Sequence, residues 1–231
     1  MRQTGTIALK IRGELVEMKL SIPAGQAEPG EMLDAARAMT DAIVAAMARK
    51  AERETGPISC GAGCDACCRQ FIAVSAAEAR DLAAYVDAQP DARRAALRER
   101  FAVAAAALRD SAGATLRETG LNYLARRVPC PFLEDGRCSV YERRPLGCRE
   151  YLVTSPAANC AAPTAETVHP VPMPARVSNA LIRISAPGKP VAEGFVALQQ
   201  VLEWAAAHPE PPARRTGPEM LKEMVESLTK S

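Results

Sequence analysis

The spacing of the cysteines constrains this chain more than any other feature of its sequence. Four cysteines fall within nine residues and four more follow at wider intervals; the groups are Cys60, Cys64, Cys67 and Cys68, then Cys130, Cys138, Cys148 and Cys160. A metal centre needs several thiolates within a few ångströms, and short loops bring sulfur atoms together at little cost in chain entropy. Gly61 and Gly63 let the first loop turn sharply. We therefore predict that the eight cysteines bind metal.

Length and charge set the context in which these thiols act. The chain has 231 residues with 29 basic and 27 acidic side chains, so its net charge of +2 gives no general attraction to nucleic acid or anionic membranes. No stretch approaches the roughly 20 apolar residues of a membrane span. Charged residues interrupt residues 1–20, so we expect no signal peptide there. We expect a cytoplasmic protein without nucleic-acid or membrane partners, in which cysteines indicate metal binding rather than disulfides.

The first 54 residues show two different hydrophobic periods. Residues 6–11 and 15–22 alternate apolar and polar side chains on either side of Gly13, which predicts a β-hairpin with one buried face within 1–23. Over 31–54 the apolar residues recur every three or four positions, a stripe typical of a helix packed on a core; they are Met32, Ala36, Met39, Ile43 and Met47.

Helical patterns dominate the chain outside the cysteine loops. Ser75 and Glu78 form a capping-box motif that predicts a helix to about Ala88, and Pro90 begins another. We expect further helices near 175–185, at 193–207 and at 218–229. The predicted fold is mainly α with a small N-terminal β-hairpin and irregular cysteine-rich metal-binding loops packed on helices. We predict one domain over 1–231, with a cysteine-cluster core at 60–160 and a C-terminal helical extension at 166–231.

The surroundings of the cysteines favour iron–sulfur chemistry, with zinc as the alternative. All eight ligands are sulfur, and Pro131 follows Cys130 as in ferredoxin-type sequences. Only Cys64 and Cys67 have the spacing of a zinc knuckle. The spacing from Cys60 to Cys67 also matches radical S-adenosylmethionine enzymes, but the sequence shows no βα repeat for their barrel. Four thiolates around a divalent ion leave a charge of about −2, which nearby arginines can compensate: Arg69, Arg137, Arg144 and Arg149.

The partition of the ligands stays open. Each group of four can close its own site, or the groups can interleave. The side chains of adjacent Cys67 and Cys68 point differently, so they serve two sites or one of them is a spare thiol. His169 follows Cys160 by nine residues and can replace a sulfur ligand, although a lone histidine is more often structural. His208 ends a predicted helix, where a cation suits the helix dipole.

These motifs resemble those of a known family. The motifs are Cys-x3-Cys-x2-Cys-Cys, Cys130-Pro-Phe-Leu and Cys138-Ser-Val-Tyr-Glu-Arg-Arg-Pro-Leu-Gly-Cys148-Arg. They are similar to those of the CxxCxxCC family of zinc- or iron-chelating proteins, also called YkgJ-type cysteine cluster proteins. The similarity spans about 60–160, and the first spacing has three residues where the family name has two. The resemblance implies a protein that binds zinc or an iron–sulfur cluster.

The same resemblance raises the question of catalysis. The family includes flagellin lysine N-methylases, longer chains thought to use an iron–sulfur cluster with S-adenosylmethionine. This sequence has no Gly-x-Gly-x-x-Gly fingerprint, so S-adenosylmethionine is implied only through that subset. We expect Tyr141, Arg144 and Arg149 beside the ligands, where arginines can donate to sulfur or bind an anionic group. The alternatives to a metal-cluster protein are a methyl-transfer or redox enzyme, and a zinc-binding structural, storage or carrier protein with a protein partner or substrate.

Overall fold

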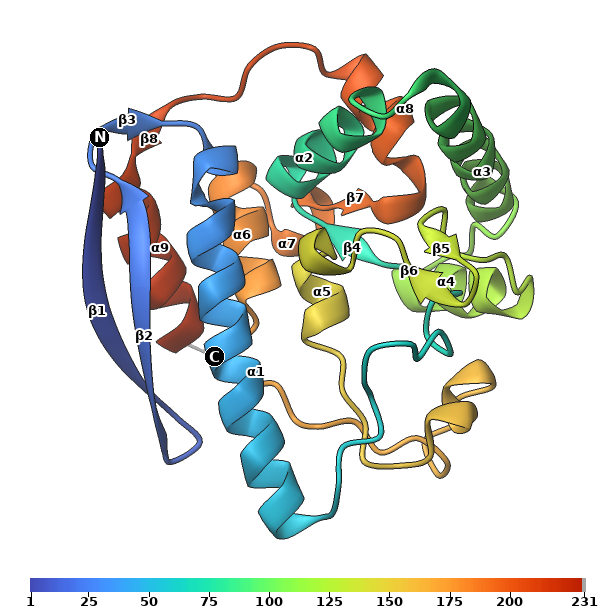
Figure 1. Cartoon of the computed structure of the whole chain (residues 1–231), viewed down its shortest axis with the longest axis horizontal. Helices are drawn as coiled ribbons and strands as arrows, with labels where there is room; N and C mark the ends of the chain where they lie inside the picture. Colours follow the sequence, from blue (N-terminus) through green and yellow to red (C-terminus); the bar gives the residue numbers. More distant parts are fainter. Residues whose placement is uncertain (230–231) are drawn as a thin grey trace.

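The computed structural model describes residues 1–229, and these contain nine α-helices and four two-stranded sheets (Figure 1). The strands are β1 Arg2–Ile11, β2 Glu14–Pro23, β3 Gln26–Ala27, β4 Ala73–Val74, β5 Leu133–Glu134, β6 Arg137–Cys138, β7 Val196–Ala197 and β8 Arg215–Thr216. The helices are α1 Leu33–Glu54, α2 Ala76–Asp87, α3 Asp91–Arg109, α4 Leu116–Ala125, α5 Leu146–Arg149, α6 Val177–Ser185, α7 Val191–Gly194, α8 Val201–Ala207 and α9 Gly217–Thr229. The predicted class, mainly α with an N-terminal hairpin, is confirmed.

The N-terminal hairpin follows from its turn and its alternating pattern. β1 and β2 pair antiparallel with Ile11 opposite Glu14, which leaves a turn of two residues. Arg12 and Gly13 have φ angles of 49° and 89°, the left-handed conformations of the turn that best matches strand twist. One face of the hairpin is buried against α1 and α9; its buried residues are Leu9, Ile11, Val16, Met18, Leu20 and Ile22.

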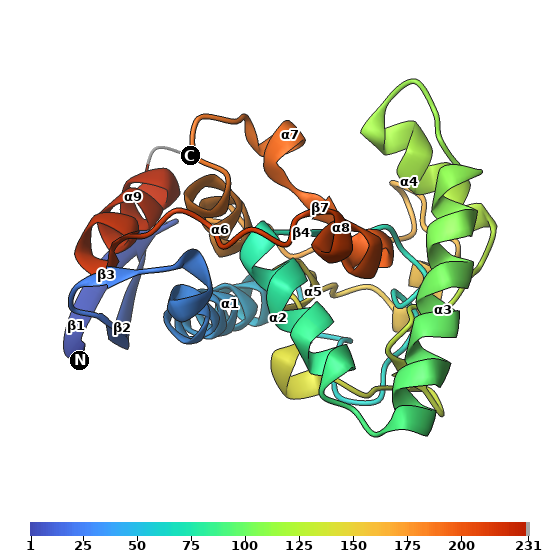
Figure 2. The ribbon, with the colours of Figure 1, turned by 90° about the horizontal axis from the view of Figure 1, so that it is seen from above.

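Helix α1 packs between this hairpin and the rest of the molecule (Figure 2). The five residues of its predicted stripe are all buried, as expected for a helix with one apolar face. Helices α6 and α9 complete the same core, to which Leu181 and Met224 contribute. This core forms one side of the molecule, and its helix α1 contacts α5, the short helix that carries Cys148 (Figure 1).

A second core lies between α2, α3 and the loops of the cysteine region. The predicted capping box is present at the start of α2: the Glu78 amide donates to Ser75 Oγ at 3.1 Å, and the Ser75 amide donates to Glu78 Oε2 at 2.8 Å. Phe101 of α3 packs edge-on against Phe132, with ring centroids 5.2 Å apart. The side chains of Cys130 and Cys138 pack against this core. The metal-binding candidates are therefore set on a packed, apolar base.

Residues 193–207 do not form the single helix that their spacing predicts. Instead the segment contains the end of α7, strand β7 and then α8. Val196 and Ala197 pair with β4, and the Leu198 amide donates to the Ile72 carbonyl at 2.8 Å. This long-range pairing interrupts the helix and brings Leu198 to the cysteine region. Within residues 1–229, no helix is long and apolar enough to cross a lipid bilayer.

Candidate metal centre

The first four cysteines lie in a loop between α1 and β4 that has no helix or strand. The Cys64 amide donates to the Gly61 carbonyl at 3.1 Å, which closes one turn. The Cys68 amide donates to the Asp65 carbonyl at 2.9 Å, which closes the next. Between the two, Gly63 has a φ of 90°, a conformation that residues with a Cβ rarely adopt. Successive tight turns therefore gather these sulfur atoms within a short length of chain.

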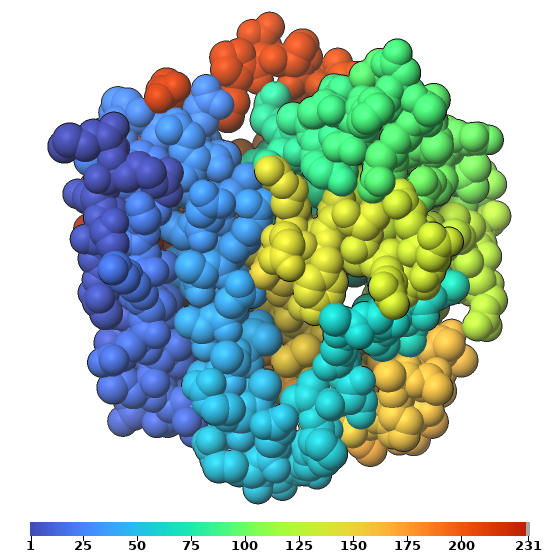
Figure 3. All heavy atoms as spheres, in the orientation of Figure 1, coloured from blue at the N-terminus to red at the C-terminus, as the bar shows by residue number. Residues whose placement is uncertain are grey.

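The second group reaches the same region from one loop and three separate elements. Cys130 lies between α4 and β5, Cys138 in β6, Cys148 in α5 and Cys160 in a 3-10 helix at 157–161; the Cys130 amide also donates to the Cys68 carbonyl at 2.7 Å. In the space-filling view, the teal segment with the first group runs between the yellow segment around 130–150 and the orange segment around 160 (Figure 3). The fold thus brings the two sequence groups together.

Six of the eight cysteines line one cavity of about 80 Å³; they are Cys64, Cys67, Cys68, Cys130, Cys138 and Cys148. Its apolar walls come from the second core and include Ile72, Phe132 and Leu198. Among the described residues, no histidine or carboxylate lines it. Cys60 and Cys160 lie outside this lining and pack together with Val153 and Val168. Six sulfur atoms are therefore the main donors that the cavity offers to a metal ion, beside the side-chain oxygens of Gln70, Tyr141 and Tyr151.

Two of the residues expected beside the ligands, Tyr141 and Arg144, also line the cavity. The Arg144 guanidinium lies 4.6 Å from the centre of the Tyr141 ring, and Tyr141 is 38% exposed. Burial raises the pKa of Cys138 and of Cys148, while the positive charge of Arg144 lowers both. Arg144 thus supplies the charge that the thiolate forms of these cysteines require.

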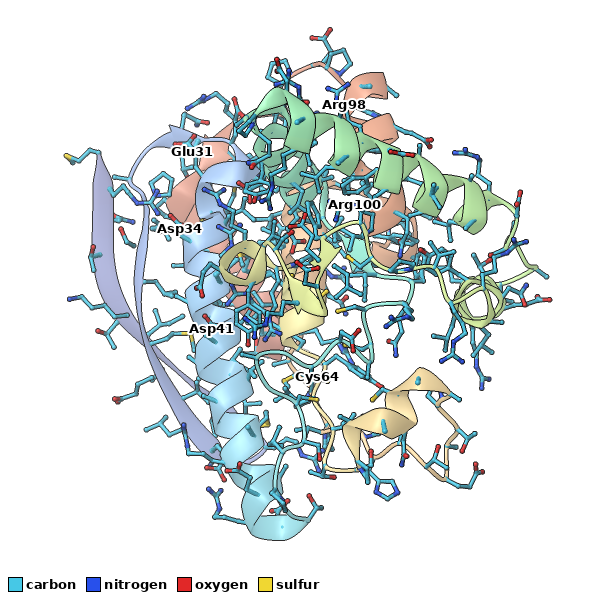
Figure 4. The ribbon with its side chains drawn as sticks, turned by 45° about the vertical axis from the view of Figure 1, so that its right-hand side comes forward. Glu31, Asp34, Asp41, Cys64, Arg98 and Arg100 are labelled. Atoms are coloured by element: carbon cyan, nitrogen blue, oxygen red, sulfur yellow. The ribbon has the colours of Figure 1, made fainter. Side chains whose placement is uncertain are left out.

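The other three arginines predicted near the site have different surroundings. Arg149 donates to both carboxylate oxygens of Asp41, at 2.8 and 3.0 Å, so it ties α5 to α1 (Figure 4). Arg69 pairs with Asp65 at 3.3 Å. Arg137 is exposed on β6. None of the three lines the cavity in the part of the chain that the structure describes.

The pKa values of four cavity thiols, those of Cys67, Cys130, Cys138 and Cys148, are raised, which favours their neutral form. Burial raises the pKa of Cys130 to about 12 and that of Cys148 well above its ordinary value. The pKa of Cys67 is raised first by its hydrogen bond with Cys68 and then by burial. Since metal ligands are thiolates, binding must release these protons.

Two buried carboxylates hold the ends of α5, the short helix behind the cavity. At its start, Glu78 accepts the Leu146 amide at 2.8 Å while also accepting the Ser75 amide and hydroxyl. After its end, Glu150 accepts the Ser178 amide at 3.0 Å and the Ser178 hydroxyl. Burial raises the pKa of both carboxyls. The helix is therefore fixed to α2 at one end and to α6 at the other.

Replacing Glu78 with alanine should lower the free energy of unfolding by about 3 kcal/mol, because the buried amides of Ser75 and Leu146 lose their acceptor. Urea unfolding followed by circular dichroism measures this loss. Glu99→Ala is the matched control, since Glu99 is exposed on α3. We expect the free energy of unfolding of Glu78→Gln to lie between those of Glu78→Ala and Glu99→Ala, because the glutamine side chain keeps one acceptor oxygen. Equal midpoints for Glu78→Ala and Glu99→Ala would show that Glu78 does not hold α5.

The structure adds a residue that lies far from the cysteines in sequence. Arg100 of α3 donates to the Pro131 carbonyl at 3.2 Å and to Glu134 at 3.0 Å (Figure 4). Burial dominates the raised pKa of Cys130, and the Arg100 charge opposes it. Nothing in the local sequence signals this role, because the helix face of Arg100 meets the loop only in the folded chain.

His169 does not join the sulfur atoms. It is exposed and lines a different cavity, together with Met47 and Lys50. Its backbone amide donates to Ser155 Oγ at 3.1 Å. The structural interpretation of this histidine therefore has support from its position, which is away from the cysteine cavity.

The donor set suits a thiophilic metal, although the sulfur atoms do not form a closed coordination shell. Within residues 1–229, no three cysteine, histidine or carboxylate side chains form a group that could hold one ion as they stand. Binding must therefore draw the sulfur atoms together, which the irregular loops permit. The cavity of about 80 Å³ is several times the roughly 10–15 Å³ that a single water requires. It thus has room for more than one atom.

The cysteine region is similar to one family of known proteins. Residues 59–167 match the family model CxxCxxCC, described as a "putative zinc- or iron-chelating domain". The chain carries a CxxCxxCC domain. All eight cysteines fall within the matched residues, whereas the hairpin, α1 and helices α6 to α9 lie outside them. No curated protein and no solved structure gives a match to the chain. The residues that match this domain thus lie between N- and C-terminal segments that share one core.

Proposed function

We propose that this protein binds an iron–sulfur cluster through the cysteines of the cavity, with zinc as the alternative metal. The observation that carries the proposal is the set of six cysteines around one cavity whose lining, among the described residues, has no histidine or carboxylate. All-sulfur sites select iron–sulfur clusters and zinc over magnesium and calcium. The size of the cavity favours a cluster, and such a cluster would supply electron-transfer chemistry when bound. A cytoplasmic location, where thiols stay reduced, belongs to the proposal.

Anaerobic purification of the full chain tests the metal directly, by a visible absorption spectrum and elemental analysis on one sample. A brown protein whose broad visible band bleaches with dithionite, with iron matched by acid-labile sulfide, would establish the cluster. A colourless protein with stoichiometric zinc would replace the cluster with the alternative metal. A protein that retains neither metal, and takes up neither after reduction, would overturn the proposal.

A second candidate function is enzymatic, and one observation favours it. Within residues 1–229 the Arg144 guanidinium makes no hydrogen bond or ion pair, yet it lines the cavity beside Tyr141 and Tyr151. A free cation beside a metal can bind the anionic group of a substrate. Calorimetric titration of the metal-loaded protein with S-adenosylmethionine tests this candidate. Binding that Arg144→Met weakens supports an enzyme, and absence of binding contradicts this particular cosubstrate.

Replacing Arg144 with methionine should weaken metal binding by roughly 10–100-fold, the usual effect of removing a group that supports the ligands. The reason is that its charge favours the thiolate forms of Cys67, Cys138 and Cys148. Competition with a chelator of known affinity measures the change. The matched control is Arg143→Met: Arg143 pairs with Asp81 at 3.1 Å and lies outside the cavity. Equal affinities of the two variants would remove Arg144 from the site.

A further inference from the structure

Strand β1 is an open edge of the N-terminal hairpin. Within residues 1–229 it pairs only with β2, and it lies at the outer side of the molecule (Figure 1). The strand is ten residues long, its register with β2 has no bulge, and its sequence has no proline. Its only charged residues, Arg2 and Lys10, lie near its two ends, and residues 2–6 are exposed. Folded proteins usually protect an edge of this length, because its unpaired backbone groups can bind another strand.

The register of the hairpin determines which backbone groups face this edge. Ile11 and Glu14 flank the two-residue turn and form its hydrogen-bonded pair, so the odd-numbered residues of β1 bond to β2. The amides and carbonyls of the even-numbered residues point away from β2, and among the described residues no backbone group bonds to them. An antiparallel partner strand must therefore place its own outward-facing residues directly opposite the even-numbered residues of β1.

We propose that the partner is β1 of a second copy of this chain, paired antiparallel about a two-fold axis at Gly5, so that the two hairpins form one sheet of four strands. In this register Thr4 lies opposite Thr6 of the second copy, and Arg2 lies opposite its Ala8. Each of these pairs exchanges two hydrogen bonds, and cross-strand threonine pairs are favourable. A two-fold axis uses the same edge of both copies, so the pairing closes at a dimer. The proposal does not depend on metal binding.

Charge favours this register and a second copy as the partner. Ala8 lies opposite Glu17 of β2, so Arg2 of one copy and Glu17 of the other share one row across the sheet, with only the small Ala8 side chain between them. Both charged side chains are exposed. An axis at Thr6 would instead place Arg2 opposite Lys10 of the second copy, and like charges directly opposite each other are destabilising. The axis at Gly5 therefore sets opposite charges in one row and avoids this repulsion.

The other face of β1 also fits its copy. There Gly5 lies opposite Gly5 of the second copy, and a Cβ at this position would meet nothing within 4 Å, so no side chain obstructs the axis. Met1 has a fully exposed apolar side chain in the single chain, and it lies opposite Leu9 of the second copy in this register. Pairing thus covers apolar surface that water otherwise surrounds, which is favourable.

Sedimentation equilibrium of the full chain tests for the dimer. We expect a dimer whose affinity falls about 100-fold in Thr6→Pro, because proline removes an outward N–H and thus one hydrogen bond from each copy, whereas no bond to β2 is lost. Thr6→Ala is the matched control: it keeps the amide and should remain a dimer. A monomer at every concentration, or equal affinities for the two variants when both are folded, would overturn the proposal.

Exchange of charge tests the register. Arg2→Glu should weaken the dimer about tenfold, because two acidic side chains then share each row. The Arg2→Glu, Glu17→Arg double variant should regain the lost affinity. That gain cannot come from the bonds that Arg2 makes to Ser21 in its own hairpin, since both variants lack them. A double variant as weak as Arg2→Glu would contradict the register.

Cross-linking at Gly5 gives an independent measurement. The Cα atoms of two residues that face each other at this axis are about 4.5 Å apart, within the range of a disulfide. Oxidation of Gly5→Cys with copper phenanthroline should therefore link two chains through residue 5, which mass spectrometry of tryptic peptides identifies. In the control Thr6→Cys the two positions are about 7–8 Å apart on a diagonal and should link far less. Stronger linkage in Thr6→Cys would overturn the register, and should circular dichroism show that Thr6→Pro does not fold, this comparison decides the question.

Discussion

Replacing Cys148 with serine should remove most of the bound metal and lower the thermal stability of the metal-loaded protein. Cys148 lies on α5 with its side chain in the cavity, and burial raises its pKa. Serine is a poor ligand for soft metals, so the affinity should fall by more than the roughly 100-fold that loss of a supporting residue costs. Because metal-binding free energy adds to folding free energy, the melting temperature should fall with it.

The measurement is metal content per chain after gel filtration, together with a melting curve with and without a strong chelator. His169→Ala serves as the control, since His169 is exposed and outside the cavity; we expect its metal content and melting temperature to be unchanged. The chelator should destabilise the unmodified chain and have little effect on Cys148→Ser. Full metal retention in Cys148→Ser would exclude this cysteine from the ligands, and loss of metal in His169→Ala would make that histidine a ligand.

Much of the fold could be predicted from the sequence because its determinants are close neighbours along the chain. The two-residue turn at Arg12 and Gly13 sets the register of the hairpin. The stripe of α1 is visible because one helix face must be buried along its whole length. The capping box joins Ser75 and Glu78, three residues apart. Each of these features needs only local information.

The parts that could not be predicted depend on contacts between distant residues. Glu78 is visible as a cap, but its bond to the Leu146 amide spans 68 positions. The pairing of Val196 with Val74 interrupts a helix that local spacing favours. The motif that contains Arg149 gives no sign that the guanidinium binds Asp41 of α1.

The cysteines illustrate the same limit. Their spacing predicts a metal site, but whether the two groups interleave depends on the fold. The hydrogen bond from the Cys130 amide to the Cys68 carbonyl joins the groups, and the cavity draws members from both. Conversely, Cys60 lies close to Cys64 in sequence but outside the cavity lining. Sequence proximity alone therefore does not show which cysteines line the same cavity.

Raising the pH should strengthen metal binding steeply, because the cavity thiols must lose protons to become ligands. Burial raises the pKa of Cys130 to about 12 and shifts those of Cys138 and Cys148 in the same direction. At neutral pH these groups are protonated, so each one that binds metal releases one proton. Linkage then requires about a tenfold gain in affinity per pH unit for each proton released, and four thiols would give roughly 10⁴-fold per unit.

Zinc competition against a chelator whose own protonation is known, at several pH values between about 6 and 8, measures this slope in the full chain. The number of protons released follows independently from calorimetry in buffers of different ionisation enthalpy. In Cys138→Ser the slope should fall by about one proton, because one thiol no longer has to ionise. A slope near zero in the unmodified chain would mean that the ligands are already thiolates before the metal arrives. In that case the positive charge of Arg144 would lower the pKa of the cavity thiols by more than burial raises it. The steep pH dependence of metal binding would then appear in Arg144→Met.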